Sequence, residues 1–576
     1  MANSEKGLLF PNQSNYASQS RSRYVGKLLI HAIAIAFILR ASFGLHERFT
    51  SGEDSRTSLA KCPQVEPLVP GQQTEALKSM EEFILSDQFR NETVARLAGA
   101  VRIPTISYDD LAPVGEDPRW DAFFNFASYL KTTFPLVHSQ LRLEKVNTHG
   151  LLYTWHGSDP DARPTVLMGH QDTVPVVEAT EDQWTHPPFD GYFDGRYIWG
   201  RGSNDCKNVV IGILEAVELL LQADFKPKRT IVLSFGFDEE ISGRNGARHL
   251  AKALVDRYGQ DGAAVVVDEG AGTSSMWGSL FAQPGVGEKG HIDVEIIIRM
   301  PGGHSSIPPA HNGIGVAAQL ISLIEANPYE PHFHAENPFL GLLECGNAHS
   351  PDFPAQLKKH LPWKERSCAA KKDKLALEAA KLGDEVKYLF TTSLAPDIIS
   401  GGVKANALPE RIRILVNHRI NVGDSVRSVQ SKIASLAEQI AAKHNLTVQA
   451  FNDEPEAPRT IKLNSDVHAL EPAPITPTSV EGTTPYSVLS GTTRALYGPD
   501  MLVAPGIMTG NTDTRLYWDL TRHIFRYGPG WDPEGGSMFD DGGIHTVNEK
   551  VSVVAHTRGV QWYSTFMRNM DEAELE

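Results

Sequence analysis

A histidine and an aspartate stand two residues apart where an apolar stretch of the sequence ends. In "VLMGHQDTVPV" (166–176), a β-branched and apolar run leads to Gly169 and then to His170 and Asp172. Residues i and i+2 of an extended chain point to the same side, so both side chains would face one place. A single pair of this kind is more often a structural hydrogen bond than a functional site. Its meaning depends on which other residues reach the same place.

Two further segments bring carboxylates to strand ends or helix starts. "GRGSNDCKN" places Asp205 just before a long amphipathic helix, where the simpler interpretation is a helix-capping aspartate. "SFGFDEEISG" ends a strand with Glu239 and Glu240, whose adjacent carboxylates would repel each other if both stood unpaired.

Two more segments complete the set. "VVVDEG" ends a strand with Asp268 and Glu269, which point to opposite sides of an extended chain, so only one can join the others. We expect Asp268 to be that residue, with Glu269 as the alternative. "GGIHTVNEK" places His545 at the start of the last helix, where a capping or core histidine is the simpler interpretation.

Together these segments offer nitrogen and oxygen ligands without a thiolate, a combination that suits zinc, cobalt or manganese. Two metals about 3.5 to 4 Å apart need one bridging carboxylate and at least two more ligands each. Two histidines and three or four carboxylates meet that requirement. The sequence therefore predicts a site for two metal ions.

The composition limits the kinds of partner. The chain has 576 residues, of which 41% are hydrophobic, and a formal net charge of -16. No basic patch offsets this charge, so nucleic acid is not expected as a partner. The four cysteines are too few and too scattered for a disulfide framework, and none forms a Cys-x-x-Cys pair.

The elements that must position these residues follow an α/β pattern. β-Branched runs alternate with helical ones up to about residue 287, which predicts a mainly parallel sheet flanked by helices, with the site at its strand ends. "HIDVEIIIRM" and "RIRILVNHRI" begin a second pattern, which predicts a smaller α+β two-layer domain inserted into the first as a lid or dimerisation domain. The expected parts are a cytoplasmic tail (1–23), a signal anchor (24–45), a stalk (46–73), a catalytic domain in two parts (74–287 and 456–576) and the inserted domain (288–455).

The N-terminal segment favours a membrane anchor. Arg21, Arg23 and Lys27 precede the apolar run "LLIHAIAIAFIL" (28–39), an order that keeps the tail in the cytoplasm. We expect an uncleaved signal anchor, and a cleaved signal peptide is the alternative. The sequons at Asn91 and Asn445 fit a lumenal body.

The motifs, in this order, resemble one known family. The blocks around His170 and Asp205, the "DEE" and "DEG" strand ends, "PGGHSS" and "GGIH" are similar to those of the co-catalytic zinc peptidases that include aminoacylase and glutamate carboxypeptidase. Within that family, "GHQDTVPV", "NTDTRLYWDLT" and "GIHTVNEKVSV" resemble the fungal vacuolar Gly-Xaa carboxypeptidase branch. The resemblance covers about residues 74 to 569.

The resemblance implies a role for each metal-site residue. His170 and Glu240 would hold different zinc ions, Asp205 would bridge the two, and His545 would complete the Glu240 site. The "DEG" carboxylate would complete the His170 site. The resemblance also implies that Asp172 orients His170, that Glu239 is the general base, and that the peptide bond after Asp205 is cis.

The resemblance also implies substrate contacts. His304 in "PGGHSS" would stabilise the negative charge on the substrate carbonyl and, in dimeric relatives, reaches the partner's active site. Asn406 and Arg419 match positions that contact a substrate carboxylate, and Gly510 begins the "GNTDTRLY" stretch that would shape the carboxylate pocket. For His304 a turn histidine, and for Arg419 a charge at a sheet edge, remain the alternatives.

These expectations define a membrane-anchored exopeptidase with two zinc ions per subunit, which removes the C-terminal residue from short peptides in the vacuole lumen. A homodimer would form through the inserted domain. An N-acyl amino acid hydrolase on the same scaffold is the alternative, because both enzymes cleave an amide beside a free carboxylate. A metal-binding or receptor protein without activity would lack a base or a ligand, and none is missing here.

Overall fold

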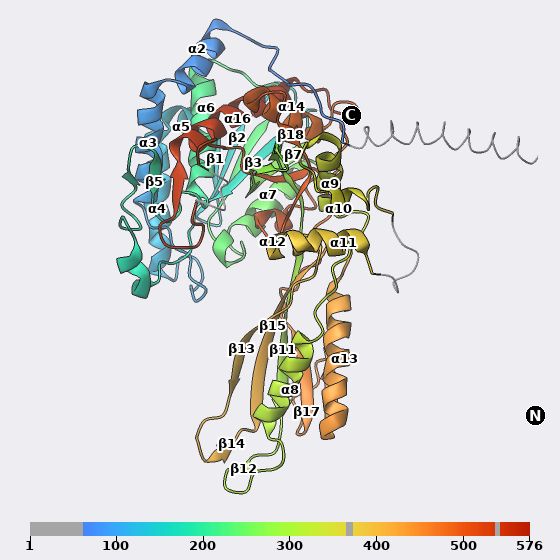
Figure 1. The fold of residues 1–576 in the computed structure, drawn as a ribbon. Coiled ribbons are helices and arrows are strands. Elements are labelled where there is room, and N and C mark those ends of the chain that lie inside the picture. Colours follow the sequence, from blue (N-terminus) through green and yellow to red (C-terminus); the bar gives the residue numbers. More distant parts are fainter. Residues whose placement is uncertain (1–61, 365–371, 536–541) are drawn as a thin grey trace, which may run out of the picture. The chain divides into compact units, whose positions relative to one another are not determined.

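The computed structural model describes residues 62–364, 372–535 and 542–576 (Figure 1). The expected cytoplasmic tail, the signal anchor and stalk residues 46–61 lie outside the described residues. In the part of the chain that is described, no helix combines the length and the apolar character of a membrane span.

A mixed sheet forms the main layer. Within the described residues it has eight strands, in the order β1 (Arg142–Val146), β2 (Gly150–Trp155), β6 (Ile231–Gly236), β3 (Thr165–His170), β7 (Val265–Ala271), β20 (Ile524–Tyr527), β10 (Gly285–Glu288) and β19 (Gly506–Met508). The central strands β6, β3, β7 and β20 are parallel, as expected. The sheet as a whole is mixed: β10 and β19 are also parallel, whereas the pairs β1–β2, β2–β6 and β10–β20 are antiparallel. The first of these pairs is joined by a short turn, and strands joined in that way can pair only in antiparallel fashion.

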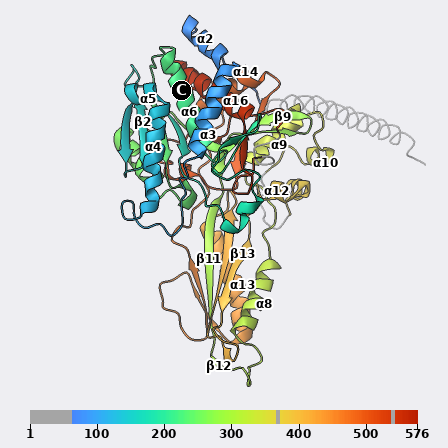
Figure 2. The same cartoon turned by 90° about the vertical axis from the view of Figure 1, so that its left-hand side faces the viewer.

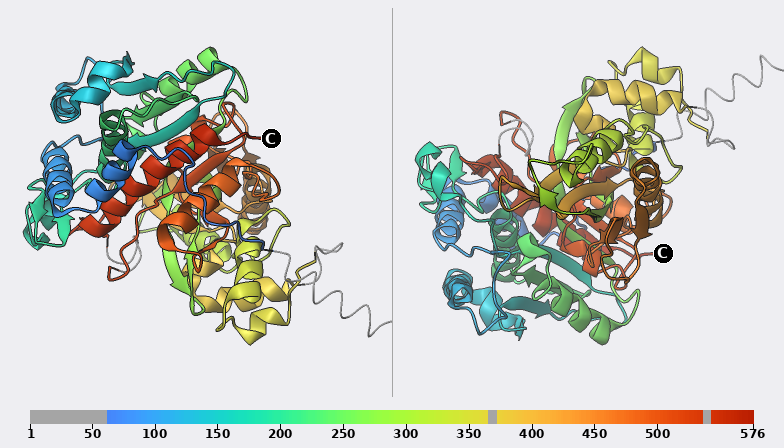
Figure 3. Two further views of the ribbon diagram at one scale, coloured as in Figure 1. Left: turned by 90° about the horizontal axis from the view of Figure 1, so that it is seen from above. Right: turned by 90° about the horizontal axis from the view of Figure 1, so that it is seen from below.

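Helices cover both faces of this sheet. On β3, Leu167 faces one hydrophobic core, and Val166 and Met168 face the other, as the alternation of side chains along a strand requires. The first core is covered by α2 (Glu75–Ile84), α3 (Asp87–Val101), α4 (Ala122–Thr133), α5 (Pro135–Gln140), α6 (Lys207–Gln222), α14 (Pro485–Tyr497) and α16 (Val553–Glu572). Figure 3 shows α16, in red, running beside α2 and α14. Helix α7 (Ala247–Tyr258) covers the second core.

A second, smaller sheet has helices on one face only. Its strands in the described chain are β13 (Ala395–Gly401), β15 (Arg411–Ile420), β11 (Gly290–Arg299), β17 (Thr460–Ser465) and β16 (Thr447–Ala450). Buried residues alternate along β11 and β15, and they pack against α8 (Gly313–Glu325) and α13 (Val426–His444) (Figure 2). This is the two-layer arrangement expected for the inserted domain, and β17 extends it beyond the expected boundary at residue 455.

Short elements complete the described chain. Strands β9 (Ser279–Ala282), β18 (Leu502–Val503) and β8 (Thr273–Met276) form one small sheet, and β4 (Tyr192–Phe193), β5 (Tyr197–Trp199) and β21 (Lys550–Ser552) form another. A two-stranded pair joins β12 (Gly303–His304) to β14 (Ala407–Leu408). Four short helices lie between α8 and β13: α9 (Pro338–His349), α10 (Ala355–Lys358), α11 (Lys374–Ala379) and α12 (Asp384–Lys387).

A disulfide bond joins Cys62 to Cys345, with 5.1 Å between the Cα atoms. The scattered cysteines predicted no disulfide framework, and this bond closes a separation of 283 residues that no local spacing could reveal. Both residues belong to a hydrophobic core that also contains Phe281, Leu357 and Leu375. The bond therefore fastens the start of the described chain to α9.

Candidate two-metal active site

A cavity of about 1050 Å³ lies where the parallel strands end. It is lined by five of the residues expected at the metal site: Asp205, Glu239, Glu240, Glu269 and His545. They come from the start of α6, from the segments at the ends of β6 and β7, and from the loop before β21. The carboxyl ends of parallel strands are the usual place for a ligand in an α/β fold, because the connecting loops converge there.

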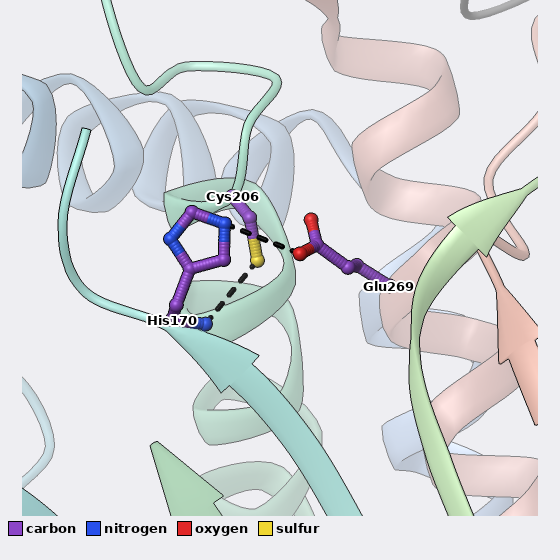
Figure 4. A group of neighbouring side chains, drawn as sticks. All are labelled: His170, Cys206 and Glu269. Carbon is purple, nitrogen blue, oxygen red and sulfur yellow. Dashed lines mark hydrogen bonds and ion pairs between the residues drawn. The ribbon is translucent and has the colours of Figure 1, made fainter. Parts of the chain in front are cut away.

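His170, the last residue of β3, is the centre of a first group of ligand atoms. Its Nε2 atom lies 3.0 Å from Oδ1 of Asp205 and 3.2 Å from Oε1 of Glu269. Figure 4 shows the carboxylate of Glu269, on β7, directed at the imidazole ring.

His545 is the centre of a second group. Its Nε2 atom lies 3.1 Å from Oδ2 of Asp205 and 3.1 Å from Oε2 of Glu240. The two oxygens of Asp205 therefore face different histidines. Ligands about 2.0 to 2.1 Å from a tetrahedral zinc ion are separated by about 3.3 Å, so both groups fit one ion each. The described residues thus fit a pair of metal ions bridged by Asp205.

The turn that carries Asp205 is held by a residue that the sequence did not single out. Oε1 of the buried Glu549 accepts hydrogen bonds from the backbone N–H groups of Asn204 (3.0 Å) and Asp205 (3.2 Å). Its Oε2 accepts one from Arg201 at 2.6 Å. The peptide bond between Asp205 and Cys206 is cis, as the resemblance implied.

Cys206 lies beside His170 but faces the backbone rather than the cavity. Its Sγ atom accepts a hydrogen bond from the backbone N–H of His170 at 3.4 Å (Figure 4). Burial raises the pKa of this thiol well above its usual value, so the neutral form is favoured. Because the Sγ atom faces this N–H group and does not line the cavity, the donors that face the cavity are oxygen and nitrogen atoms.

The carboxylate of Asp172 accepts hydrogen bonds from several parts of the site. In the described chain, its Oδ1 faces Nδ1 of His170 at 3.2 Å and accepts from the backbone N–H of Glu239 at 3.1 Å. Its Oδ2 accepts from the backbone N–H of Glu240 at 3.1 Å and from the hydroxyl of Ser107 at 2.7 Å. Asp172 thus orients the ring of His170 and the two glutamates together, whereas Ser107 was missed because a lone serine before the first strand carries no signal.

The contacts distinguish the two carboxylates of "DEG". Glu269 faces His170, while Asp268 is buried, with no hydrogen-bond partner for its Oδ2 among the described residues. Burial, followed by the charge of Glu269, raises the pKa of Asp268 to about 8. The geometry therefore favours the alternative, Glu269, over the expected Asp268, because β7 turns its odd-numbered side chain toward the cavity.

Glu239 lines the same cavity as Asp205, Glu240 and His545. Burial, followed by the charge of Asp513, raises its pKa well above the usual range for a carboxyl group. A carboxylate with a raised pKa accepts a proton more readily, which suits a general base. Asp513 is a third missed residue, and it belongs to the "GNTDTRLY" stretch that was expected only to shape a pocket.

The expected substrate-binding residues fall into two groups. Arg419 and Gly510 line the cavity, and Nη1 of Arg419 donates to Oδ1 of Asn511 at 3.2 Å. His304 is exposed on β12, and Asn406 is exposed next to β14, at the far end of the smaller sheet from the cavity (Figure 1). Within one chain, the structure does not bring these two residues to the site.

Lys289 is a buried cation beside this pocket. Its Nζ atom donates to the backbone carbonyl groups of Thr391 at 2.7 Å and Tyr388 at 3.0 Å. Burial, followed by the charge of Arg419, lowers the pKa of Lys289 to about 7. Arg419, together with Lys289 when the lysine is protonated, gives this end of the cavity a positive character that suits a carboxylate.

Comparisons with known proteins agree with this geometry. The sequence profile of Peptidase family M20/M25/M40 matches residues 166–569. The chain is 41% identical over 533 residues to carboxypeptidase S of Saccharomyces cerevisiae, covering 89% of each chain. It is 31% identical to the N-fatty-acyl-amino acid synthase/hydrolase PM20D1 of Bos taurus, covering 89% of this chain and 92% of the relative. The crystal structure of the M20 family metallo-carboxypeptidase Sso-CP2 from Sulfolobus solfataricus superposes with a TM-score of 0.55 at 19% identity, over 83% of this chain and 99% of that one.

Proposed function

The chain belongs to Peptidase family M20/M25/M40, and on this premise we propose that it is a two-zinc exopeptidase that removes the C-terminal residue from short peptides of the Gly-Xaa type. The observation that carries the proposal is Asp205, whose two oxygens face two different histidines. The resemblance to carboxypeptidase S supports a metallo-carboxypeptidase, and the donor set supports zinc as the metal.

In this proposal, His170, Asp205 and Glu269 hold one metal ion, and His545, Asp205 and Glu240 hold the other. When bound, the two ions supply Lewis-acid polarisation of the scissile carbonyl and activation of water near neutral pH. Asp172 holds the neutral His170 ring by accepting from Nδ1, which leaves Nε2 free to bind metal.

Glu239 moves the proton. It accepts a proton from the attacking water and donates it to the nitrogen of the departing amino acid, so that one side chain serves as base and then as acid. Arg419 and Lys289 lie at the same cavity and would bind the free carboxylate of the substrate, which places the last peptide bond beside the metals. A peptide held in this way loses one C-terminal residue per reaction.

The proposed roles of His304 and Asn406 require a second copy of the chain. Both residues are exposed on the smaller sheet and do not line the cavity of their own chain. We propose that the protein forms a homodimer through the inserted domain, so that His304 donates a hydrogen bond to the carbonyl oxygen of the substrate in the partner's site.

The test separates the base from a ligand. Glu239→Gln should retain both metals and lose several orders of magnitude in turnover of Gly-Leu, because coordination survives and proton transfer does not. His545→Ala should lose metal as well as activity. Metal content, measured by mass spectrometry, and hydrolysis rates distinguish the general base from the metal ligand. Equal metal loss in both variants would contradict these roles.

A second candidate activity is hydrolysis of N-acyl amino acids. Apolar and aromatic side chains gather in the cavity beside the proposed carboxylate end, among them Met276, Tyr388, Leu389, Ile507 and Trp531. A relative of this chain is named as an N-fatty-acyl-amino acid synthase/hydrolase. Parallel assays with Gly-Leu and N-acetyl-leucine discriminate the two activities, and a higher kcat/KM for the acyl substrate would replace the first proposal with the second.

We also propose that the enzyme reaches the vacuole lumen through the secretory pathway as a signal-anchored glycoprotein. The Cys62–Cys345 disulfide supports an oxidising compartment, since such bonds rarely persist in the cytosol. Asn91 and Asn445 are both exposed, as glycosylation requires. Carbonate extraction of membranes tests the anchor, because an anchored protein stays with the membrane pellet.

A further inference from the structure

A cluster of two histidines and one aspartate lies outside the active site. His332 and His334 are in the loop between α8 and α9, and Asp424 precedes α13. None of the three lines the cavity described above. We propose that these three residues form a separate binding site for a late first-row divalent cation, with zinc as the ion that fits best.

The three ligand atoms lie at the separations that one ion requires. The two Nε2 atoms are 2.9 Å apart, and Oδ1 of Asp424 lies 3.3 Å from Nε2 of His332 and 3.6 Å from Nε2 of His334. These distances are close to the roughly 3.3 Å between ligands around a tetrahedral zinc ion. Two imidazoles and one carboxylate are donors that zinc, nickel and copper accept.

One backbone contact of His332 suits a metal ligand. Nδ1 of His332 lies 2.9 Å from the backbone carbonyl oxygen of Glu330, which can only accept, so Nδ1 carries the proton. In the neutral ring, Nε2 then carries a lone pair, and this atom faces Nε2 of His334. A hydrogen bond from the other ring nitrogen to a carbonyl group, as at Nδ1 here, is the arrangement that fixes the tautomer of metal-binding histidines.

The surrounding chain holds each ligand in place. Phe333 packs into a hydrophobic core beside Phe390, which turns His332 and His334 together to the opposite side of the extended loop. The hydroxyl of Thr392 donates to Oδ2 of Asp424 at 2.5 Å, so Oδ1 is left for the histidines.

Gly423 makes room for the ring of His334. A Cβ atom at this position would lie 2.1 Å from Cγ of His334, and the φ angle of +91° is one that glycine adopts without strain. The turn before α13 is thus shaped around the histidine. The side chains of His332 and His334 remain 35% and 32% exposed, so an ion can enter and a water molecule can complete the coordination.

The chain also contains a matched control. His311 and His444 form another T-shaped pair, with ring centroids 5.0 Å apart, compared with 4.7 Å for His332 and His334. Among the described residues, no carboxylate joins this second pair in a group of ligand atoms. The two pairs share residue type and ring geometry and differ in the third donor.

The experiment measures zinc bound by the purified holoenzyme after equilibrium dialysis against micromolar zinc. Wild type should bind about one zinc per chain more than H332Q/H334Q, and the control H311Q/H444Q should match wild type. Asp424→Asn should weaken the extra binding, because it removes the charged donor and keeps an acceptor for Thr392. Equal zinc content in wild type and H332Q/H334Q would overturn the proposal and would mean a hydrogen-bonded cluster only.

A second measurement uses the unaltered protein and so does not depend on folding of the variants. Carbethoxylation of histidines is mapped by peptide mass spectrometry with and without added zinc. Zinc should protect His332 and His334 and leave His311 reactive. If zinc leaves the reactivity of His332 and His334 unchanged, the site does not exist, whatever the state of the catalytic metals.

Discussion

Replacing Asp172 with asparagine keeps a side chain of nearly the same size and should still disrupt the active site. Each oxygen of Asp172 faces two donors: His170 and the backbone N–H of Glu239 on one side, Ser107 and the backbone N–H of Glu240 on the other. An amide offers one oxygen and one NH2 group. With the NH2 group toward His170 and Glu239, two donors would meet another donor; with it toward Ser107 and Glu240, only the N–H of Glu240 would, because the serine hydroxyl can accept instead.

The size of the effect follows from that count. A hydrogen bond to a charged acceptor is worth about 1.5 to 3 kcal/mol, so losing one or two costs about 1.5 to 6 kcal/mol. At about 1.4 kcal/mol for each factor of ten, Asp172→Asn should lower kcat/KM by about one to four orders of magnitude if the full cost falls on the transition state. Ser107→Ala removes one donor and leaves the carboxylate, so about a tenfold loss is expected.

The assay compares kcat/KM for Gly-Leu at saturating metal, with the melting temperature measured in parallel, because part of the cost can appear as lost stability. The expected order is wild type, then Ser107→Ala, then Asp172→Asn. An Asp172→Asn enzyme with kcat/KM within tenfold of wild type and an unchanged melting temperature would refute the reasoning. So would a Ser107→Ala enzyme as impaired as Asp172→Asn.

Three further predictions follow from other contacts. Arg419→Lys should raise KM for Gly-Leu by about tenfold with a smaller change in kcat, since lysine cannot grip a carboxylate with two parallel hydrogen bonds; steady-state kinetics with an unchanged KM would remove Arg419 from the carboxylate pocket. Cys345→Ser should destabilise the protein by about 2 to 5 kcal/mol, toward the upper value because the bond closes 283 residues, and denaturant titration with and without reductant measures the loss. Mixing inactive His304→Ala and Glu239→Gln chains under subunit exchange should restore about a quarter of wild-type activity, because half of the dimers are mixed and each has one complete site; no recovery would place His304 outside the partner's site.

The sequence predicted the ligands that stand at strand ends better than the residues that support them. His170 and Glu240 could be proposed as ligands because a short polar motif follows an apolar run, and His545 because of the "GGIH" motif. The structure brings all three close to Asp205. The choice between Asp268 and Glu269 was open, because it depends on which face of β7 meets the cavity, and an isolated strand does not reveal that.

The supporting residues gave no local signal. Glu549 reaches Asp205 across more than three hundred residues of sequence, and Ser107 reaches Asp172 across 65. Both are common residue types in ordinary contexts, so only the folded chain shows what they touch. The same holds for the Cys62–Cys345 bond, whose partners become neighbours only after α9 has packed against the main body.

The bridging position of Asp205 also has a consequence for biosynthesis. His170, Asp205, Glu240 and Glu269 are made before the smaller sheet, whereas His545 is made after it. Glu549, which holds the turn that carries Asp205, is also made after the smaller sheet. In a nascent chain, the first group of ligands therefore lacks this support while the second still lacks its histidine. Peptide hydrolysis would begin only once the inserted domain and the strands β19 and β20 have folded. The enzyme would therefore be inactive while it is still emerging from the ribosome.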